Sequence, residues 1–247
     1  MQNAAIVTTT YYPENSGSSK IRAGLALYLF EKACKSEYEV ITIDGGSFSD
    51  FLDRAKTLGA KIIPQKENGI GGARRQAFKE GYSTGKEIII WTEPEKHDLI
   101  RSIPKIINPL LGKRADLVIP SRRALGSYPS AQQFIEPFCN LFWKELTGKE
   151  FDMWFGPRAM LRESALLFIN YKSNYGDKWD NLHMPVMDAI KWGKKVIGLE
   201  IDYIHDKEQR DNEEHSLEFY KKRIEQLNNL LPAFEEYWNR NPTIEIS

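Results

Sequence analysis

Short apolar runs rich in β-branched residues alternate with helix-patterned segments along the first half of the chain. The apolar runs lie at residues 4–10, 38–43, 61–64, 87–91 and 116–120. Segments with helical spacing separate them, at residues 18–35, 49–58, 71–81 and 99–111. This alternation predicts a mostly parallel sheet, joined by right-handed crossovers and covered by helices on both faces. The expected fold class is therefore α/β.

The pattern changes after residue 121. An amphipathic stretch rich in Phe and Trp covers residues 131–146, and a strand-and-turn segment follows at 152–160. We then expect a short helix at 162–171, a loop at 174–181, a helix at 183–191 and an apolar strand at 196–204. Apolar residues three or four positions apart predict a long amphipathic helix at 216–238. No repeat or linker divides the chain.

Charge and hydropathy exclude several classes of protein. The 247 residues contain 34 Lys and Arg against 34 Asp and Glu, so there is no excess positive charge for binding nucleic acid. No apolar run approaches the roughly 18 residues of a membrane-spanning helix, and no signal peptide is recognisable. Cys34 and Cys139 lie on predicted helix faces and cannot form a disulfide framework. We expect a cytoplasmic protein.

Polar residues follow the predicted strands at the edge where open α/β sheets bind ligands. Thr9 lies at the end of the first strand, and Tyr11, Pro13 and Glu14 follow it. Asp44 follows the second strand, Gly69, Gly72, Arg74 and Arg75 lie at the third helix, and Glu93 and Glu95 follow the fourth strand. Carboxylates, glycines and arginines on one edge suit a nucleotide diphosphate with a divalent cation.

The order of these motifs resembles the family 2 glycosyltransferases and their nucleotide-sugar-binding GT-A fold, a Rossmann-like α/β/α sandwich. The resemblance rests on the Pro13 loop, Asp-Gly-Gly-Ser at 44–47, Gly-Gly-Ala-Arg-Arg at 71–75 and the acidic pair that ends an apolar strand. It covers roughly the first half of the chain. It implies transfer of a sugar from a nucleoside-diphosphate sugar to an acceptor hydroxyl of unknown identity.

The resemblance implies one domain over residues 1–247. Its nucleotide-sugar-binding half covers about 1–120, its acceptor-side half about 121–215, and a C-terminal helix about 216–247. That helix could pack on the domain or pair with a second copy of the chain.

On the donor side, the resemblance makes Asp44 the residue that hydrogen-bonds the nucleobase; an Asp-Gly turn is the alternative. It implies close backbone approach to the donor at Gly69 and Gly72, and phosphate neutralisation by Arg74 and Arg75; a surface helix with exposed arginines is the alternative. The remaining donor-side positions are Thr9, Tyr11, Pro13, Glu14, Trp91, Thr92 and Glu93.

Glu93-Pro94-Glu95 falls where the family carries an Asp-x-Asp metal motif. The resemblance implies Mg²⁺ or Mn²⁺ at Glu93 and Glu95, with His205 as a third ligand. Glutamate is longer than aspartate, however, and Pro94 stiffens the spacer. A solvated acidic turn, or a lost metal site in which Lys96 neutralises phosphate, are the alternatives.

On the acceptor side, Gly156, Pro157 and Arg158 resemble the family's turn beneath the donor sugar, and could equally form a structural turn. The resemblance implies that Asp180, or secondly Asp177, is the general base, whereas either could cap a helix beginning near Leu182. Trp179 could stack on a pyranose ring or pack in the core.

Two other functions remain open from the sequence. A sugar-phosphate nucleotidyltransferase normally carries a glycine-rich basic loop directly after its first strand, whereas here the Gly-Gly-Ala-Arg-Arg cluster follows the third. A glycosyltransferase-like binding protein without turnover would be consistent with Glu-Pro-Glu in place of Asp-x-Asp.

Overall fold

A seven-stranded sheet forms the centre of the computed structural model, which describes residues 3–240. The strands are β1 (Ala4–Thr10), β2 (Glu39–Asp44), β3 (Lys61–Pro64), β4 (Ile88–Trp91), β5 (Leu117–Arg122), β6 (Arg158–Leu161) and β7 (Val196–Ile201). Their order is β3-β2-β1-β4-β6-β5-β7. Only β6 is antiparallel to its neighbours β4 and β5 in this described sheet. The predicted mostly parallel α/β fold is confirmed.

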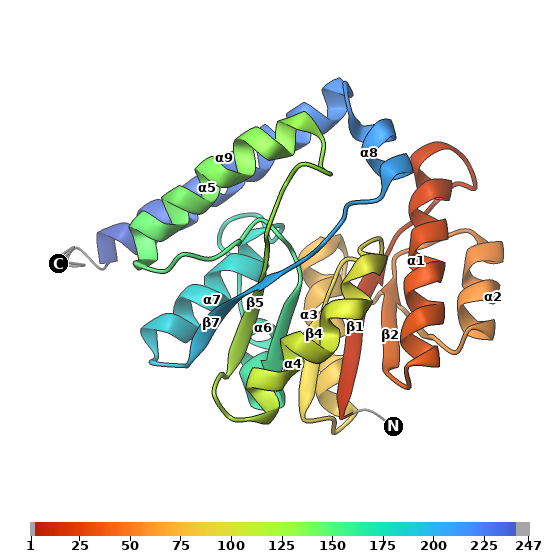
Figure 1. Ribbon diagram of the computed structural model, residues 1–247, viewed down its shortest axis with the longest axis horizontal. Coiled ribbons are helices and arrows are strands. Elements are labelled where there is room, and N and C mark those ends of the chain that lie inside the picture. Colours follow the sequence, from red (N-terminus) through yellow and green to blue (C-terminus); the bar gives the residue numbers. More distant parts are fainter. Residues whose placement is uncertain (1–2, 241–247) are drawn as a thin grey trace.

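Helices cover both faces of the sheet. They are α1 (Gly17–Lys35), α2 (Ser49–Thr57), α3 (Gly69–Ser83), α4 (Ile103–Leu111), α5 (Ser130–Thr147), α6 (Ala165–Ile169), α7 (Asp180–Lys191), α8 (Lys207–Glu213) and α9 (Leu217–Arg240). Short 3₁₀ turns precede α4 and α6, at His97–Ser102 and Arg162–Ser164. Figure 1 shows α1 and α4 in front of the sheet, with α3 and α6 behind it.

The continuous apolar runs arise because the central strands are buried on both faces. Successive residues of a strand point to opposite faces, so Ile88 and Ile90 pack into the core with α1, α2 and α4. Ile89 and Trp91 pack into the other core, with α3, α6 and α7. An apolar residue is therefore required at every position of β4.

Helices α5 and α9 lie side by side at one end of the sheet (Figure 1). Phe142 and Trp143 of α5 make ring contacts with Phe234 of α9. The pair covers the edge of the second core, which includes Trp143 and Phe234. The two helices therefore form one unit above the carboxyl ends of the strands.

Several boundaries differ from the sequence predictions. β7 ends at Ile201, so His205 follows a loop, and α8 was not predicted. α7 begins at Asp180 rather than at residue 183. The predicted C-terminal helix corresponds to α9, and residues 241–247 lie outside the described part of the chain. Within residues 3–240, no helix is long and apolar enough to cross a membrane.

Candidate functional site

Two adjoining cavities open at the carboxyl edge of the sheet. The edge cavity, of about 820 Å³, is lined by the ends of β1 and β2 and by the start of α3. The inner cavity, of about 400 Å³, lies between the β4 end, the β6 turn and α9. Volumes of this size suit nucleotide and sugar ligands.

The structure distributes many of the predicted site residues between these cavities. Thr9, Tyr11, Asp44 and Gly69 line the edge cavity. Arg74, Glu93, Glu95, Gly156, Arg158, Trp179 and His205 line the inner cavity. The other predicted residues line neither of the two: Pro13, Glu14, Gly72, Arg75, Trp91, Thr92, Pro157, Asp177 and Asp180.

Asp44 lines the edge cavity and holds the turn that follows β2. Its carboxylate accepts hydrogen bonds from the Thr10 hydroxyl at 2.9 Å and from the backbone N–H groups of Gly46 at 2.9 Å and Ser47 at 3.0 Å. The Asp-Gly turn is therefore present. Because Asp44 also lines the cavity, the turn and a ligand-contacting role are compatible.

The two arginines of α3 have different surroundings. Arg74 is buried and donates to the Asn181 amide oxygen at 2.9 Å, with its guanidinium 5.5 Å from the centre of the Trp91 ring. Burial lowers the pKa of Arg74 to about 10. Arg75 pairs with Asp177 at 2.6 Å and with Glu67 at 3.3 Å. Only Arg74 lines the inner cavity.

The glycines of α3 make room for protein side chains. A Cβ at Gly71 would meet the Asp177 carboxylate, and one at Gly72 would lie 2.6 Å from the Glu67 Cβ. Gly69 has a positive φ of 85°, a conformation that favours glycine, and lines the edge cavity. Of the two predicted donor-side glycines, only Gly69 lines the edge cavity.

The Glu-Pro-Glu segment places its two carboxylates in different environments. Glu95 pairs with Arg22 of α1 at 2.6 Å and accepts a hydrogen bond from the Tyr12 hydroxyl at 3.0 Å. Glu93 lies against Gly156, where an added Cβ would meet its carboxylate. The Glu93 Oε2 atom is buried and has no hydrogen-bond partner among the described residues. Glu93 is therefore the less engaged carboxylate.

His205 contacts Tyr128, which precedes α5, and Glu213 at the end of α8. Its ring stacks on Tyr128 with centroids 4.4 Å apart, and its Nε2 lies 3.5 Å from the Glu213 carboxylate. Burial lowers the pKa of His205, against the opposing effect of Glu213. In the described part of the chain, no three His, Cys, Asp or Glu side chains are grouped to hold a metal. The predicted set of Glu93, Glu95 and His205 is not assembled, because Glu95 is bound to Arg22 and Tyr12 and His205 lies beside Glu213.

Lys96 lines the inner cavity and lies among aromatic rings. Its ammonium lies 4.9 Å from the Phe155 ring centre, 5.8 Å from Tyr203 and 5.9 Å from Tyr128. Cation–π attraction holds a lysine in such a position. These ring contacts position the Lys96 ammonium at the inner cavity, where the alternative of phosphate neutralisation by Lys96 stays a prediction.

The turn before β6 is built around Arg158. This side chain is fully buried and donates to the backbone carbonyls of Phe155, Pro157 and Met153. Burial lowers the pKa of Arg158 to about 10. The predicted turn is present, and Arg158 fixes its shape so that Gly156 faces Glu93.

The predicted bases Asp180 and Asp177 line neither of the two cavities, and Asp177 pairs with Arg75. Asp180 is 1% exposed and accepts hydrogen bonds from the Tyr171 hydroxyl at 2.9 Å and the Lys178 N–H at 3.0 Å. It is the first residue of α7, which begins earlier than expected, but the N-cap is Trp179 and no side chain caps the helix, so the helix-capping alternative is wrong. Through its hydrogen bonds, Asp180 orders the segment that carries Trp179 into the inner cavity.

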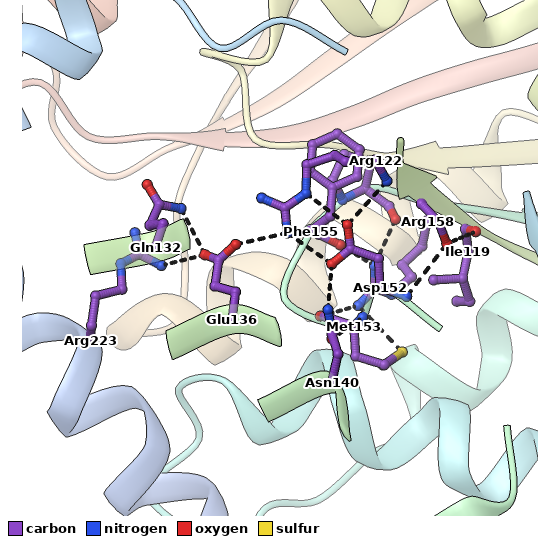
Figure 2. A network of polar contacts seen from close by, with 12 residues as sticks. Ile119, Arg122, Gln132, Glu136, Asn140, Asp152, Met153, Phe155, Arg158 and Arg223 are labelled. Atoms are coloured by element: carbon purple, nitrogen blue, oxygen red, sulfur yellow. Dashed lines mark hydrogen bonds and ion pairs between the residues drawn. The ribbon is translucent and has the colours of Figure 1, made fainter. Parts of the chain in front are cut away.

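A buried ionic network beside the inner cavity was not foreseen from the sequence (Figure 2). Arg122 of β5 pairs with Asp152 at 2.7 Å and with Glu136 of α5 at 2.7 Å. Glu136 also accepts from Gln132 at 2.7 Å and lies 3.3 Å from Arg223 of α9. Burial raises the pKa of Asp152, but the charge and hydrogen bonds of Arg122 outweigh it and lower that pKa overall. The network joins the α5–α9 unit to the sheet.

The sequence offered a weak signal for this network. Glu136 is the single acidic residue within an otherwise apolar and amide-rich stretch at 131–143, which is unusual for an exposed helix face. Arg22 and Lys222, which line both cavities, were also missed. Each lies in a helix where a charged residue is ordinarily a solvated surface residue.

The mixed sheet, the helices on both its faces and the cavities at its carboxyl edge define a GT-A-type fold. The family model for Glycosyl transferase family 2 matches residues 24–166, more than half of the chain. The protein belongs to this family and is a glycosyltransferase. No curated protein matches the chain.

Solved structures share this fold at low sequence identity. Glucosyl-3-phosphoglycerate synthase from Mycobacterium tuberculosis, in complex with Mn²⁺, UDP and glucosyl-3-phosphoglycerate, has a TM-score of 0.65 at 16% identity over 94% of this chain and 80% of that chain. Its complex with Mg²⁺ and UDP has a TM-score of 0.62 at 16% identity, covering 92% and 78% of the two chains. A putative nucleotide-diphospho-sugar transferase from Desulfovibrio desulfuricans G20 has a TM-score of 0.53 at 12% identity, covering 95% and 99%.

Proposed function

We propose that the protein transfers a sugar from a nucleoside-diphosphate sugar to the hydroxyl of an acceptor. The observation that carries this proposal is the pair of adjoining cavities at the carboxyl edge of the sheet, one reaching Asp44 and the other reaching Glu93 and Arg158. The edge cavity would hold the nucleoside, with Asp44 facing the base. The inner cavity would hold the sugar and the acceptor.

In the reaction, the acceptor oxygen forms a bond to the anomeric carbon of the sugar. The bond from that carbon to the diphosphate oxygen breaks, and its electron pair stays on the nucleoside diphosphate. The acceptor hydroxyl loses its proton to a base. Catalysis then depends on holding the two substrates in line and on stabilising the charge of the leaving diphosphate.

A divalent cation is implied by the structural neighbours, whose complexes hold Mn²⁺ or Mg²⁺ together with UDP. In this chain Glu93 is the carboxylate free to face such an ion, because its Oε2 has no partner among residues 3–240. Glu95 could join it only by releasing Arg22 and Tyr12. The predicted three-residue metal set therefore does not fit, and Glu93 is the residue that could face an ion without releasing a partner.

The general base is assigned by comparing two variants. Asp180 lies behind Trp179 and Lys178, which favours a positioning role. Glu93 lines the inner cavity and has an unpaired oxygen. If Glu93 is the base, Glu93→Gln abolishes transfer in Mn²⁺ and in EDTA alike and leaves nucleotide affinity within about twofold, whereas an effect confined to Mn²⁺ indicates a metal ligand. Loss of transfer in Asp180→Asn alone, at unchanged nucleotide affinity, assigns the base to Asp180.

A thermal-shift panel tests the proposed function. UDP, GDP, CDP and ADP and their common sugar conjugates are each added with Mn²⁺ or with EDTA, because a ligand that binds the folded state raises its melting temperature. A selective shift that Asp44→Ala abolishes supports the donor site, and sugar transfer to an acceptor then completes the test.

Other outcomes point to the other candidate functions. Release of pyrophosphate from a nucleoside triphosphate and a sugar 1-phosphate identifies a nucleotidyltransferase. Tight binding of a sugar nucleotide without hydrolysis or transfer to any acceptor identifies a binding protein. The absence of any shift refutes the donor site.

A further inference from the structure

The two cavities meet at three shared residues. Arg22 of α1, Ile70 of α3 and Lys222 of α9 line both of them. If the nucleoside lies in the edge cavity and the sugar in the inner cavity, the diphosphate that joins them passes this junction. Two of the three side chains at the junction carry a positive charge.

Arg22 holds the second carboxylate of the Glu-Pro-Glu segment. Its Nη2 lies 2.6 Å from the Glu95 Oε1, and the same oxygen accepts from the Tyr12 hydroxyl at 3.0 Å. The Arg22 side chain is 43% exposed, whereas that of Glu95 is 6% exposed. Guanidinium has five N–H donors in a fixed fork, so the contact with Glu95 leaves donors for a phosphate.

Lys222 has no partner of its own. It forms no ion pair and no hydrogen bond among residues 3–240, in contrast to the adjacent Lys221, which pairs with Glu218. Loss of hydration between the cleft walls and repulsion from Arg223 and Arg22 lower the pKa of Lys222 to about 8, against the opposing charges of Glu213 and Glu95. Much of the side chain is nevertheless exposed to solvent. An unpaired ammonium in a cleft is a ready site for an anion.

We propose that Arg22 and Lys222 bind the diphosphate of the donor and supply the positive charge that a divalent cation would otherwise supply. This inference rests on the proposed function. It adds the two residues that contact the diphosphate and the source of the positive charge there. Arginine binds phosphate oxygens in pairs and lysine acts as a point charge. Together they stabilise the negative charge on the leaving diphosphate without requiring Glu95 to release its partners.

The experiment measures binding of UDP, GDP, CDP and ADP, and of their monophosphates, by calorimetry in Mn²⁺ and in EDTA. For the wild-type protein we expect the preferred diphosphate to bind with an affinity that changes less than about threefold between the two conditions. Arg22→Gln and Lys222→Gln should each weaken binding of the diphosphate by roughly tenfold or more, as expected for loss of a charge-assisted hydrogen bond. The same two substitutions should reduce the affinity for the monophosphate less than the affinity for the diphosphate.

Matched variants separate this proposal from a metal site. Lys221→Gln changes the neighbouring lysine and should leave diphosphate affinity unchanged. Glu95→Gln should preserve or strengthen diphosphate binding because it frees Arg22, whereas loss of a metal ligand would weaken binding in Mn²⁺. Melting temperatures of all variants confirm that they are folded.

Three results overturn the inference. Diphosphate binding that disappears in EDTA refutes it while leaving the proposed function intact. If Lys222→Gln and Lys221→Gln bind the diphosphate with equal affinity, Lys222 does not contact it. Failure of every nucleotide to bind the wild-type protein in either condition refutes the proposed function together with the inference.

Discussion

Replacing His183 with glutamine should remove part of the protein's sensitivity to acid. His183 is 4% exposed and packs against the rings of Trp143, Trp154 and Phe234. Its Nδ1 lies 2.9 Å from the Trp179 carbonyl, which fixes Nδ1 as the protonated nitrogen of a neutral ring. The Nε2 atom is buried without a partner among the described residues.

Burial lowers the pKa of His183 from 6.5 to about 3, and the positive charges of Arg158 and Arg74 add to the effect. The folded protein therefore keeps this ring neutral at pH values where the unfolded chain takes up a proton. Between pH 6.5 and about pH 3, the free energy of unfolding falls by about 1.4 kcal/mol for each pH unit. At pH 4.5 this one residue should lower the free energy of unfolding by about 3 kcal/mol, and well above pH 6.5 its effect should vanish.

Urea unfolding at pH 7.5 and pH 4.5, followed by tryptophan fluorescence, measures this cost. His183→Gln cannot titrate, so its free energy of unfolding should fall by about 3 kcal/mol less than that of the wild type between the two pH values. His215→Gln, at an exposed position, is the control and should behave as the wild type. Equal losses in His183→Gln and the wild type would refute the reasoning.

Three further perturbations follow from the packing of the site. Glu136→Ala leaves Arg122 and Arg223 facing an emptied site and should lower the free energy of unfolding in urea by about 3–5 kcal/mol; a loss below about 1 kcal/mol would contradict this. Gly156→Ala pushes its Cβ into the Glu93 carboxylate and should lower stability by about 1–3 kcal/mol and impair transfer; full activity at unchanged stability would count against that contact. Asp44→Asn keeps an acceptor for the turn and should remain folded while nucleotide affinity falls roughly tenfold in calorimetry; unchanged affinity for every nucleotide would remove Asp44 from the donor site.

The sequence predicted the sheet well because its central strands are buried on both faces. A strand such as β4 must be apolar at every position, so it is visible in the sequence without knowledge of its neighbours. β6 was recognised only as part of a strand-and-turn segment. Four residues carry no signal for strand direction, and the antiparallel pairing with β4 and β5 depends on contacts far apart in the chain.

For the site, the sequence could identify residues that follow strands but not the partners they meet. Asp44 and Glu93 line the cavities because the carboxyl ends of parallel strands converge at one edge, and Arg74 lies in the second turn of α3, which begins at that edge. The engagement of Glu95 could not be foreseen, because its partner Arg22 comes from α1, more than seventy positions away in the chain. The buried position of Asp180 depends likewise on Tyr171 and on the packing of α7.

By itself, the sequence determined the α/β class, the mostly parallel sheet and the edge at which polar residues collect. These features follow from local periodicity and from the alternation of strands and helices, which are properties of neighbouring residues. The tertiary structure alone decided which charges meet: Arg22 with Glu95, Arg122 with Glu136, and Lys222 with no partner in the described chain. Charge pairing depends on distances of a few ångströms between distant segments, and a linear pattern does not contain those distances.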